Sequence, residues 1–348
     1  MLHIFYHTDL DGIGVKILGV IFAKLNKIPY TTHCCGYSKI NREVTQCLQE
    51  NPEGIFIGDL SVSEETAELL EQAYQKGLKV SLFDHHDPAL WLNKYEWATV
   101  KTNYYGKPCC GASLMAEDRR FARIKRHLAY FIEQVTEWDT WNWKYHDNQI
   151  AYQLNALFAI LGDEDFTSYI LNQVFPDGSH HFGYITDENS LLSKDAKIMS
   201  DTHQRLAEQL ANSCEKYMYT MNLWVPTDDK EIKLKTGVVF LNSSLSIVGD
   251  KILDKHPELD VLMMIVFPGN ISWRSHKDLP ISLSKVAKSA TGRGGGHANA
   301  SGSLIPFSVF QDIFCGFLDR CFQDKLDYSH FTSAFERRER ERMAKYTS

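Results

Sequence analysis

The chain has 348 residues, of which 44% are hydrophobic, and its formal net charge at pH 7 is -7. This length is enough for two domains, each with a hydrophobic core of its own. The acidic net charge excludes a general attraction to polyanions, so a nucleic acid would have to bind at a local site. No stretch reaches the roughly 20 apolar residues that span a bilayer, and no secretory signal is visible. We therefore expect a cytoplasmic protein with no membrane partner.

The first 185 residues alternate short apolar runs with helical patterns. Three apolar runs are predicted strands, namely LHIFYH at 2–7, GIFIGDL at 54–60 and KVSLFDHH at 79–86. Helices are expected at 12–27 and 61–77, the second one capped by serines and ended by Gly77, and the pattern at 111–175 is mainly helical. This alternation predicts an α/β fold with a mostly parallel sheet that helices cover on both faces.

The second half has a different composition. Residues 187–217 form a polar-rich stretch without Gly or Pro, which predicts a long helix, and a smaller α/β domain is expected beyond it. Its predicted strands are TGVVFLNSS, DVLMMIVFPGN and ISWRS, and its predicted helices lie near 245–256 and 308–323. The expected division is a catalytic domain at 1–185, a helical linker at 186–218, a second domain at 219–325 and a charged tail at 326–348.

Charged side chains follow each of the three predicted strands of the first domain. They are Asp9 and Asp11 after the first strand, Asp59 after the second, and Asp84, His85 and His86 after the third. The carboxyl ends of parallel strands line one edge of a sheet, where ligands bind. Asp139 in TEWDTWNW is a further candidate for this edge. For a single motif the alternative is a turn or a helix cap, for example Asp11 as the cap of the helix that follows it.

Several carboxylates side by side repel one another, and divalent cations remove that repulsion. A mixture of carboxylate and imidazole suits Mn²⁺ or a similar ion, and two metals that share one carboxylate make a hydrolytic site. Three acidic strand ends at one edge therefore favour a metal centre over three unrelated caps.

Four short motifs resemble the signature of the DHH phosphoesterases, in the family's order: HTDLDG, GDLS, DHH and EWDTW. A fifth, GRGGGHANASG, is similar to the glycine-rich signature of the DHH-associated domain. The resemblance covers residues 1 to about 325. It implies a parallel-sheet DHH domain and a smaller α/β DHH-associated domain, joined by a helical linker. Within the family, DLDG and WDTWNW most resemble the bacterial oligoribonucleases that degrade nano-RNA.

The resemblance also implies two divalent metal ions, Mn²⁺ by preference and Mg²⁺ or Co²⁺ as alternatives. The implied ligands are His7, Asp9 and Asp59 for one ion, and Asp11, Asp59, His85 and Asp139 for the other, with Asp59 as the bridge. Asp84 would then orient an imidazole, and His86 would face the substrate phosphate or the leaving oxygen.

The glycine-rich stretch is the candidate substrate site of the second domain. A flexible linker is its alternative, but glycines let backbone N–H groups approach an anion, as Gly294, Gly295 and Gly296 would here. The side chains that would contact the same anion are His297, Ser301 and Arg274. Arg293 interrupts what is often a run of four glycines in the family, so it either adds a phosphate contact or is merely tolerated.

Three tryptophans, Trp138, Trp141 and Trp143, surround Asp139 in the sequence. Aromatic side chains near a nucleotide site can stack on bases, although packing in the core is the alternative for each of them.

The predicted function is a two-metal phosphodiesterase that trims short single-stranded RNA from one end to mononucleotides, while the second domain holds the far end of the substrate. Linear or cyclic dinucleotides and the bisphosphorylated adenosine nucleotide are alternative substrates. A pyrophosphatase is disfavoured, because one residue separates His7 from Asp9 where that group has three. A non-catalytic scaffold is disfavoured because all the expected ligands are present. A homodimer is one possible assembly, and no obligate protein partner is evident.

Overall fold

The structure is a computed structural model that describes residues 1–176, 182–227, 230–266, 269–275, 279–291, 294–296 and 299–305. The chain forms two compact units, Met1–Asn212 and Ser213–Ser348, and each is described by itself. The division falls near the end of helix α10 (Lys194–Glu215), inside the segment for which the sequence predicts a helical linker. The predicted charged tail at 326–348 lies outside the described residues.

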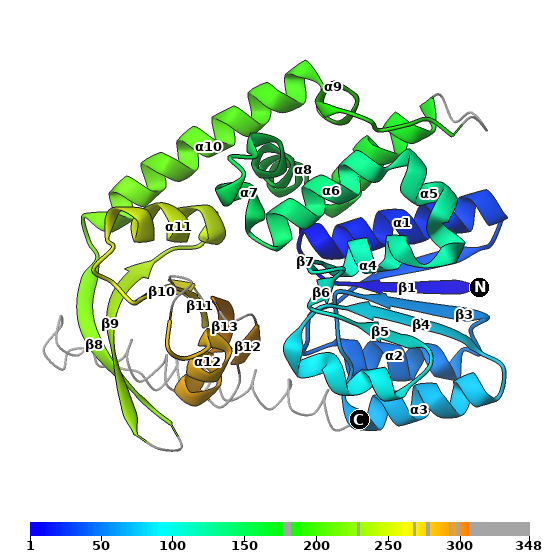
Figure 1. Ribbon diagram of the computed structural model, residues 1–348, viewed down its shortest axis with the longest axis horizontal. Coiled ribbons are helices and arrows are strands. Elements are labelled where there is room, and N and C mark those ends of the chain that lie inside the picture. The colour runs from blue at the N-terminus through cyan, green and yellow to red at the C-terminus, as the bar shows by residue number, and fades with distance from the viewer. Residues whose placement is uncertain are drawn as a thin grey trace, which may run out of the picture. The chain divides into compact units, whose positions relative to one another are not determined.

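A five-stranded parallel sheet is the centre of the first unit, with strand order β2-β1-β3-β4-β5 (Figure 1). Its strands are β1 (Leu2–Tyr6), β2 (Tyr30–Cys34), β3 (Gly54–Gly58), β4 (Lys79–Asp84) and β5 (Ala98–Val100). β1 and β3 are buried along their whole length, as expected for central strands of a sheet that is covered on both faces. The predicted α/β fold with a parallel sheet is confirmed.

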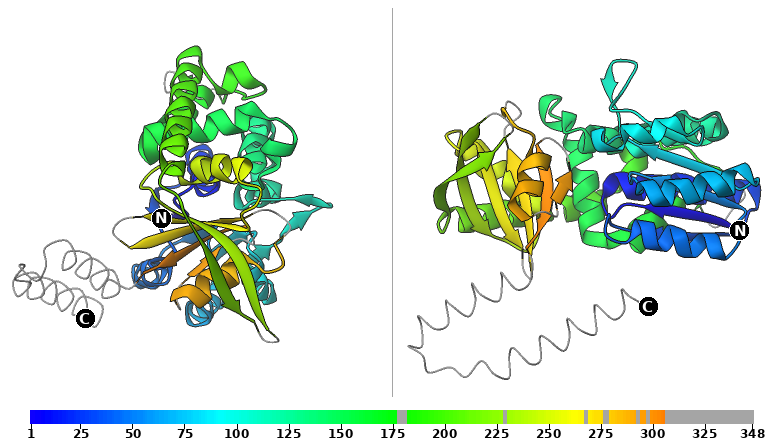
Figure 2. Two further views of the ribbon diagram at one scale, coloured as in Figure 1. Left: turned by 90° about the vertical axis from the view of Figure 1, so that its left-hand side faces the viewer. Right: turned by 90° about the horizontal axis from the view of Figure 1, so that it is seen from below.

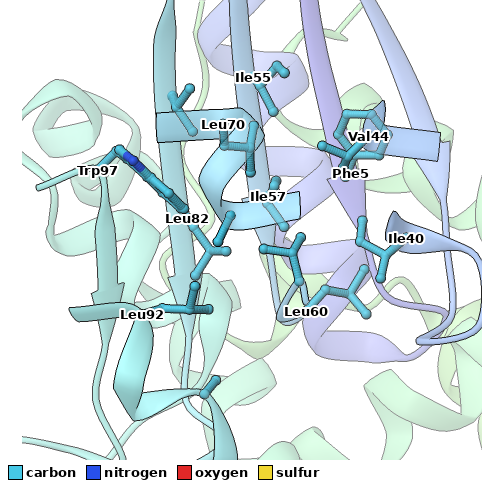
Figure 3. Close-up of a cluster of buried hydrophobic side chains, with 14 of the residues drawn as sticks. Phe5, Ile40, Val44, Ile55, Ile57, Leu60, Leu70, Leu82, Leu92 and Trp97 are labelled. Atoms are coloured by element: carbon cyan, nitrogen blue, oxygen red, sulfur yellow. The ribbon is translucent and has the colours of Figure 1, made fainter. Parts of the chain in front are cut away.

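Helices lie on both faces of this sheet (Figure 1). One face carries α2 (Ile40–Gln49) and α3 (Glu64–Gln75), and the other carries α1 (Leu10–Asn26), α4 (Gly111–Glu117), α5 (Ala122–His127) and α6 (Ala129–Asp139). Ser63 caps α3 as the sequence predicts, and Gly77 follows the helix with a positive φ of 102°. The core under α2 and α3 joins strand residues to helix residues (Figure 3), among them Phe5, Ile55, Ile57, Leu82, Val44 and Leu70.

The remaining elements of this unit are short or peripheral. They are the 3-10 helices Asp87–Lys94 and Arg119–Phe121, the β6 (Asn103–Tyr104) and β7 (Lys107–Pro108) hairpin, α7 (Asn142–Tyr145), α8 (Gln149–Val174) and α9 (Glu188–Leu191). The β6–β7 hairpin projects from the first unit (Figure 2). The helical stretch predicted at 187–217 forms two helices instead of one: α9 ends at Leu191, Leu192 is extended, and the Ser193 hydroxyl accepts a hydrogen bond from the Ala196 N–H in the first turn of α10. Among the described helices, none combines the length and apolarity that a membrane span requires.

The second unit contains a six-stranded mixed sheet in the order β12-β13-β11-β10-β9-β8, in which β9 and β10 are parallel. Its elements are β8 (Tyr219–Pro226), β9 (Glu231–Phe240), α11 (Leu245–Lys255), β10 (Val261–Val266), β11 (Asn270–Ser275), α12 (Leu283–Thr291), β12 (Gly294–Gly296) and β13 (Ala300–Leu304). β8 and β9 form a long twisted hairpin (Figure 2). Trp273 on β11 packs with Leu283 and Val286 of α12 in the core. The helix predicted near 308–323 lies outside the described residues.

A buried lysine on α1 forms ion pairs with α8. Lys16 Nζ on α1 lies 2.5 Å from Asp163 Oδ1 and 2.8 Å from Glu164 Oε1. The Tyr6 hydroxyl donates to the other oxygen of Asp163 at 2.6 Å. These contacts sit beside Gly162, whose φ of 72° interrupts the helical conformation of α8. The ion pair therefore holds the kinked helix against α1 and β1.

Lys16→Met should lower the free energy of unfolding by about 2–4 kcal/mol, because it leaves the Asp163 carboxylate partly buried without its cation. Urea unfolding measures the change. Lys24→Met, at an exposed position of the same helix, is the matched control and should stay within about 0.5 kcal/mol of the wild type. Equal effects of the two substitutions would contradict this role of Lys16.

Candidate metal centre

The end of β3 places Asp59 at the carboxyl edge of the sheet. Asp59 follows Gly58 directly and adopts a left-handed backbone conformation with φ of 56°, which is uncommon for a residue with a side chain. Its N–H donates to the carbonyl oxygen of Phe83 on β4 at 2.9 Å. The side chain is only 1% exposed. The Asp59 carboxylate is thus buried in a turn that follows β3 and is hydrogen-bonded to β4. The backbone of this turn is strained, and such strain is typical of functional sites.

Asp9 and Asp11 have different partners although they are two residues apart. Asp9 caps α1: its Oδ1 accepts from the Gly12 N–H at 3.0 Å, and its Oδ2 lies 2.7 Å from His7 Nδ1. The alternative in which Asp11 caps the helix is therefore wrong, because Asp9 already fills that position.

Asp11 contacts a helix that lies 100 residues further along the chain. Its two oxygens accept hydrogen bonds from the N–H groups of Gly111 at 2.6 Å and Ala112 at 2.7 Å, in the first turn of α4. A Cβ on Gly111 would come within 2.8 Å of the Asp59 backbone nitrogen and 3.0 Å of Asp11 Oδ2. Only glycine fits this position without displacing a candidate ligand.

The structure brings the predicted ligands together in two groups that could each hold a metal ion. One consists of His7, Asp9 and Asp59, and the other of Asp11, His85 and Asp139, which ends α6; in each group the donor atoms lie within 4.8 Å of one another. His85 Nε2 is 3.4 Å from both Asp59 Oδ1 and Asp139 Oδ2, so Asp59, a member of the first group, also lies next to the second. A third possible group, Asp59 with His85 and His86, overlaps these two.

The carboxylates of the centre destabilise one another. Burial raises the pKa of Asp59 well above its usual value, and the charges of Asp9, Asp11 and Asp139 raise it further. The pKa of Asp139 is raised in the same way, first by burial and then by Asp11 and Asp9. Burial alone would lower the pKa of His7, but the carboxylates of Asp9, Asp11 and Asp139 together outweigh it and the net shift is upward.

Two buried oxygens of the centre, Asp59 Oδ2 and Asp139 Oδ2, accept no hydrogen bond from the part of the chain that the structure describes. Unsatisfied buried carboxylate oxygens are costly unless a cation compensates them. Carboxylate oxygens together with imidazole nitrogens are donors that Mn²⁺ and similar divalent ions accept. The residues present therefore fit divalent metal ions.

Asp84 and His86 form a pair beside the two groups. Asp84 Oδ1 is 2.7 Å from His86 Nδ1 and also accepts from the His85 N–H at 2.8 Å. Burial raises the pKa of Asp84, but the hydrogen bonds from His86 and the His85 N–H and the nearby imidazoles together outweigh it, so that the pKa lies below its usual value. The ionised carboxylate holds His86 by one ring nitrogen.

Sequence reasoning missed Tyr37, whose hydroxyl oxygen lies 3.4 Å from both ring nitrogens of His86. Tyr37 follows β2, a strand that the sequence analysis does not predict because YTTHC has no continuous apolar run. Recognising β2 would have placed the residues after it at the same carboxyl edge.

Two of the three tryptophans near Asp139 belong to the core. Trp138 and Trp143 are buried and stack on each other, with ring centroids 5.5 Å apart. Trp141 is half-buried and has a positive φ of 62°. Of the three tryptophans, Trp141 is the one that is not buried.

In the second unit, Arg274 lies on β11 and is half-buried. Its guanidinium donates to the carbonyl oxygen of Trp273 at 3.0 Å and to the Ser246 hydroxyl at 2.9 Å, both uncharged acceptors. Burial lowers the pKa of Arg274 to about 10. An arginine held this way still has donors in the geometry that suits an anion.

Ser301 does not share a face with Arg274. In the β11–β13 register Ser301 is opposite Trp273, the neighbour of Arg274, and successive side chains of a strand point to opposite faces. Gly294, Gly295 and Gly296 form β12, the strand at the edge of this sheet. Arg293 and His297 lie outside the described residues.

Comparisons with known proteins show which enzymes the chain is similar to. No family model matches the chain. The chain is 29% identical over 324 residues to oligoribonuclease NrnB of Bacillus subtilis, covering 89% of this chain and 74% of that protein. It is 20% identical over 330 residues to a 3′,5′-cyclic-nucleotide phosphodiesterase of Helicobacter pylori, covering 86% of this chain and 91% of that one.

Among solved structures, exonuclease RecJ bound to manganese shares the fold, with a TM-score of 0.50 and 13% identity, over 90% of this chain and 88% of that chain. The predicted resemblance to the DHH phosphoesterases, which rests on the five motifs, is thereby confirmed.

The pKa shifts predict how the stability of the metal-free protein depends on pH. Raised pKa values make the folded protein keep protons on Asp59 and Asp139 that the unfolded chain has lost above pH 4. The contribution of these two carboxyl groups to the free energy of unfolding should therefore fall as pH rises from 5 to 8, and the raised pKa of His7 acts in the same direction. Burial lowers the pKa values of His3, His33 and His203, which act in the opposite direction, so the contribution of the centre is the difference from a variant that lacks one of its carboxylates. Urea unfolding in excess chelator at both pH values measures this.

Asp59→Asn should make the metal-free protein more stable than the wild type at pH 8, by about 1–2 kcal/mol, because it removes one of the repelling charges. Asp165→Asn, at an exposed position of α8, should leave the pH dependence unchanged. A variant at position 59 that is less stable than the wild type at pH 8 would contradict the repulsion.

Proposed function

We propose that this protein is a metal-dependent phosphodiesterase that degrades short single-stranded RNA from one end to mononucleotides. The observation that carries the proposal is the pair of ligand groups, with Asp59 as a member of one and next to the other. Two ions that share a carboxylate are the arrangement used to hydrolyse phosphodiesters.

In this proposal, His7, Asp9 and Asp59 hold one ion, and Asp11, Asp59, His85 and Asp139 hold the other. When bound, the two ions lower the pKa of water and stabilise the negative charge that develops on the phosphate. Mn²⁺ is the preferred ion because the donor set mixes imidazole with carboxylate.

The chain's own residues orient the substrate. Asp84 fixes His86 through Nδ1, so that Nε2 of His86 faces the phosphate or the leaving oxygen. Arg274 and the glycine-rich strand of the second unit bind a terminal nucleotide of the substrate. Arg274 supports this role because its hydrogen-bond acceptors in the described residues are neutral, which leaves its charge available to an anion.

Short RNA is favoured as the substrate by the likeness to a protein named oligoribonuclease over 89% of the chain. The net charge of -7 supports short substrates as well, since additional phosphates gain little from an acidic surface. A second candidate, cyclic or linear dinucleotides, is favoured by the likeness to the Helicobacter pylori cyclic-nucleotide phosphodiesterase.

Initial rates on end-labelled RNAs of about 2, 5 and 24 nucleotides with Mn²⁺ test the function, because binding at one terminal site gains nothing from extra length. Catalytic efficiency should be highest for the short RNAs and mononucleotides should appear singly, while chelation should abolish turnover. Fastest cleavage of the longest RNA, or internal cleavage, would contradict the proposal. Cleavage of a cyclic dinucleotide in preference to linear RNA would favour the second candidate.

Arg274→Ala should raise KM for a short RNA about tenfold or more, since one hydrogen bond to a charged group is lost. Hydrolysis of bis-p-nitrophenyl phosphate should change by no more than about twofold, because this small phosphodiester needs only the metal centre. Lys233→Ala, at an exposed position of β9, is the control. Equal losses of activity on both substrates in Arg274→Ala, with an unchanged melting temperature, would show that Arg274 takes part directly in the chemical step.

A further inference from the structure

Tyr37 lies at the metal centre but belongs to none of the ligand groups. It occupies the turn between β2 and α2, at the carboxyl edge of the first sheet. Its ring is tilted against His7, with centroids 5.7 Å apart, and meets His86 edge-on at 6.0 Å. A phenol therefore spans the space between a predicted ligand of one ion and the residue predicted to contact the phosphate.

The exposure of the centre shows from which side a substrate can reach it. Asp11 and Asp59 are each 1% exposed and close the inner side. The side chains of His7 and Asp9 are 24% and 48% exposed, and Tyr37 is 45% exposed. A phosphodiester must approach from this open side, so it must pass next to the Tyr37 ring.

Among the described residues, the Tyr37 hydroxyl makes only long contacts. Both of its distances to His86 nitrogens are 3.4 Å, longer than the 2.7–3.2 Å of a well-formed hydrogen bond. An anionic phosphate oxygen is a stronger acceptor, and hydrogen bonds to such oxygens are shorter and stronger than those between neutral groups. A neutral phenol also adds no charge to the surrounding carboxylates.

We propose that Tyr37 is a substrate-binding residue whose hydroxyl donates a hydrogen bond to a non-bridging oxygen of the phosphodiester that is cleaved. This inference rests on the proposed phosphodiesterase function. It adds to that function a substrate contact from the turn after β2, on the open side of the centre. None of the five sequence motifs contains this residue.

Tyr37→Phe removes the hydroxyl and keeps the ring. On a dinucleotide RNA with Mn²⁺, kcat/KM should fall about 10- to 100-fold, as expected for the loss of a hydrogen bond to a charged group. Mn²⁺ affinity, measured by calorimetry, should stay unchanged because Tyr37 is not a ligand. Tyr74→Phe is the matched control: its hydroxyl lies near the far end of α3, 3.4 Å from Glu96, and its removal should leave kcat/KM unchanged.

Phosphorothioate dinucleotides separate direct contact from positioning of His86. Sulfur in place of the contacted oxygen weakens the hydrogen bond from the Tyr37 hydroxyl. The ratio of the cleavage rate of the oxygen substrate to that of the sulfur substrate should therefore be several-fold smaller in Tyr37→Phe than in the wild type. This difference should appear for one diastereomer only. The same metal is used throughout, so effects of sulfur on metal binding cancel in this comparison.

Two results would overturn the inference: wild-type kcat/KM in Tyr37→Phe, or a reduced kcat/KM with unchanged ratios for both diastereomers. Failure of the proposed function would be distinct, because the wild-type protein itself would then not cleave the RNA dinucleotide.

Discussion

Electrostatic repulsion between carboxylates at one edge of the parallel sheet is the constraint on which the first unit depends. Asp59 and Asp139 each carry an oxygen without a hydrogen-bond donor among the described residues, and their pKa values are raised by burial and by their neighbours. Such an arrangement costs free energy in the folded protein, so it persists only because the surrounding structure over-determines it. The donor set fits divalent cations, whose charge would compensate these carboxylates, since a compact set of oxygens and imidazoles is already in place.

The fold holds these groups through contacts far apart in the sequence. Asp11 is fixed by two N–H groups of α4, and Asp59 by its bond to the backbone of β4. Asp84 holds His86 through the ring nitrogen Nδ1. Behind them, the packed core under α2 and α3 keeps the strands in register (Figure 3). The rigid sheet therefore places each donor, and the open side of the centre is left to His7, Asp9 and Tyr37.

The sequence predicts most of the metal centre because its residues follow strongly apolar runs whose strand character is plain. The same reasoning fails for Tyr37, since β2 is half-buried and lacks an apolar run. It also fails for the contact between Asp11 and Gly111, because 100 residues separate them and no local pattern records the pairing. In the second unit, ISWRS is recognisable as a strand, but only the register with β13 shows that Arg274 and Ser301 leave the sheet on opposite faces.

The central claim is that two divalent ions share Asp59. Titration of the metal-free protein with Mn²⁺, followed by calorimetry and electron paramagnetic resonance, tests it most directly. The account predicts two ions per chain and a spin-coupled spectrum, which becomes uncoupled or is reduced to one bound ion in Asp59→Ala. A single bound ion in the wild type, or two ions whose spectra show no coupling, would contradict it.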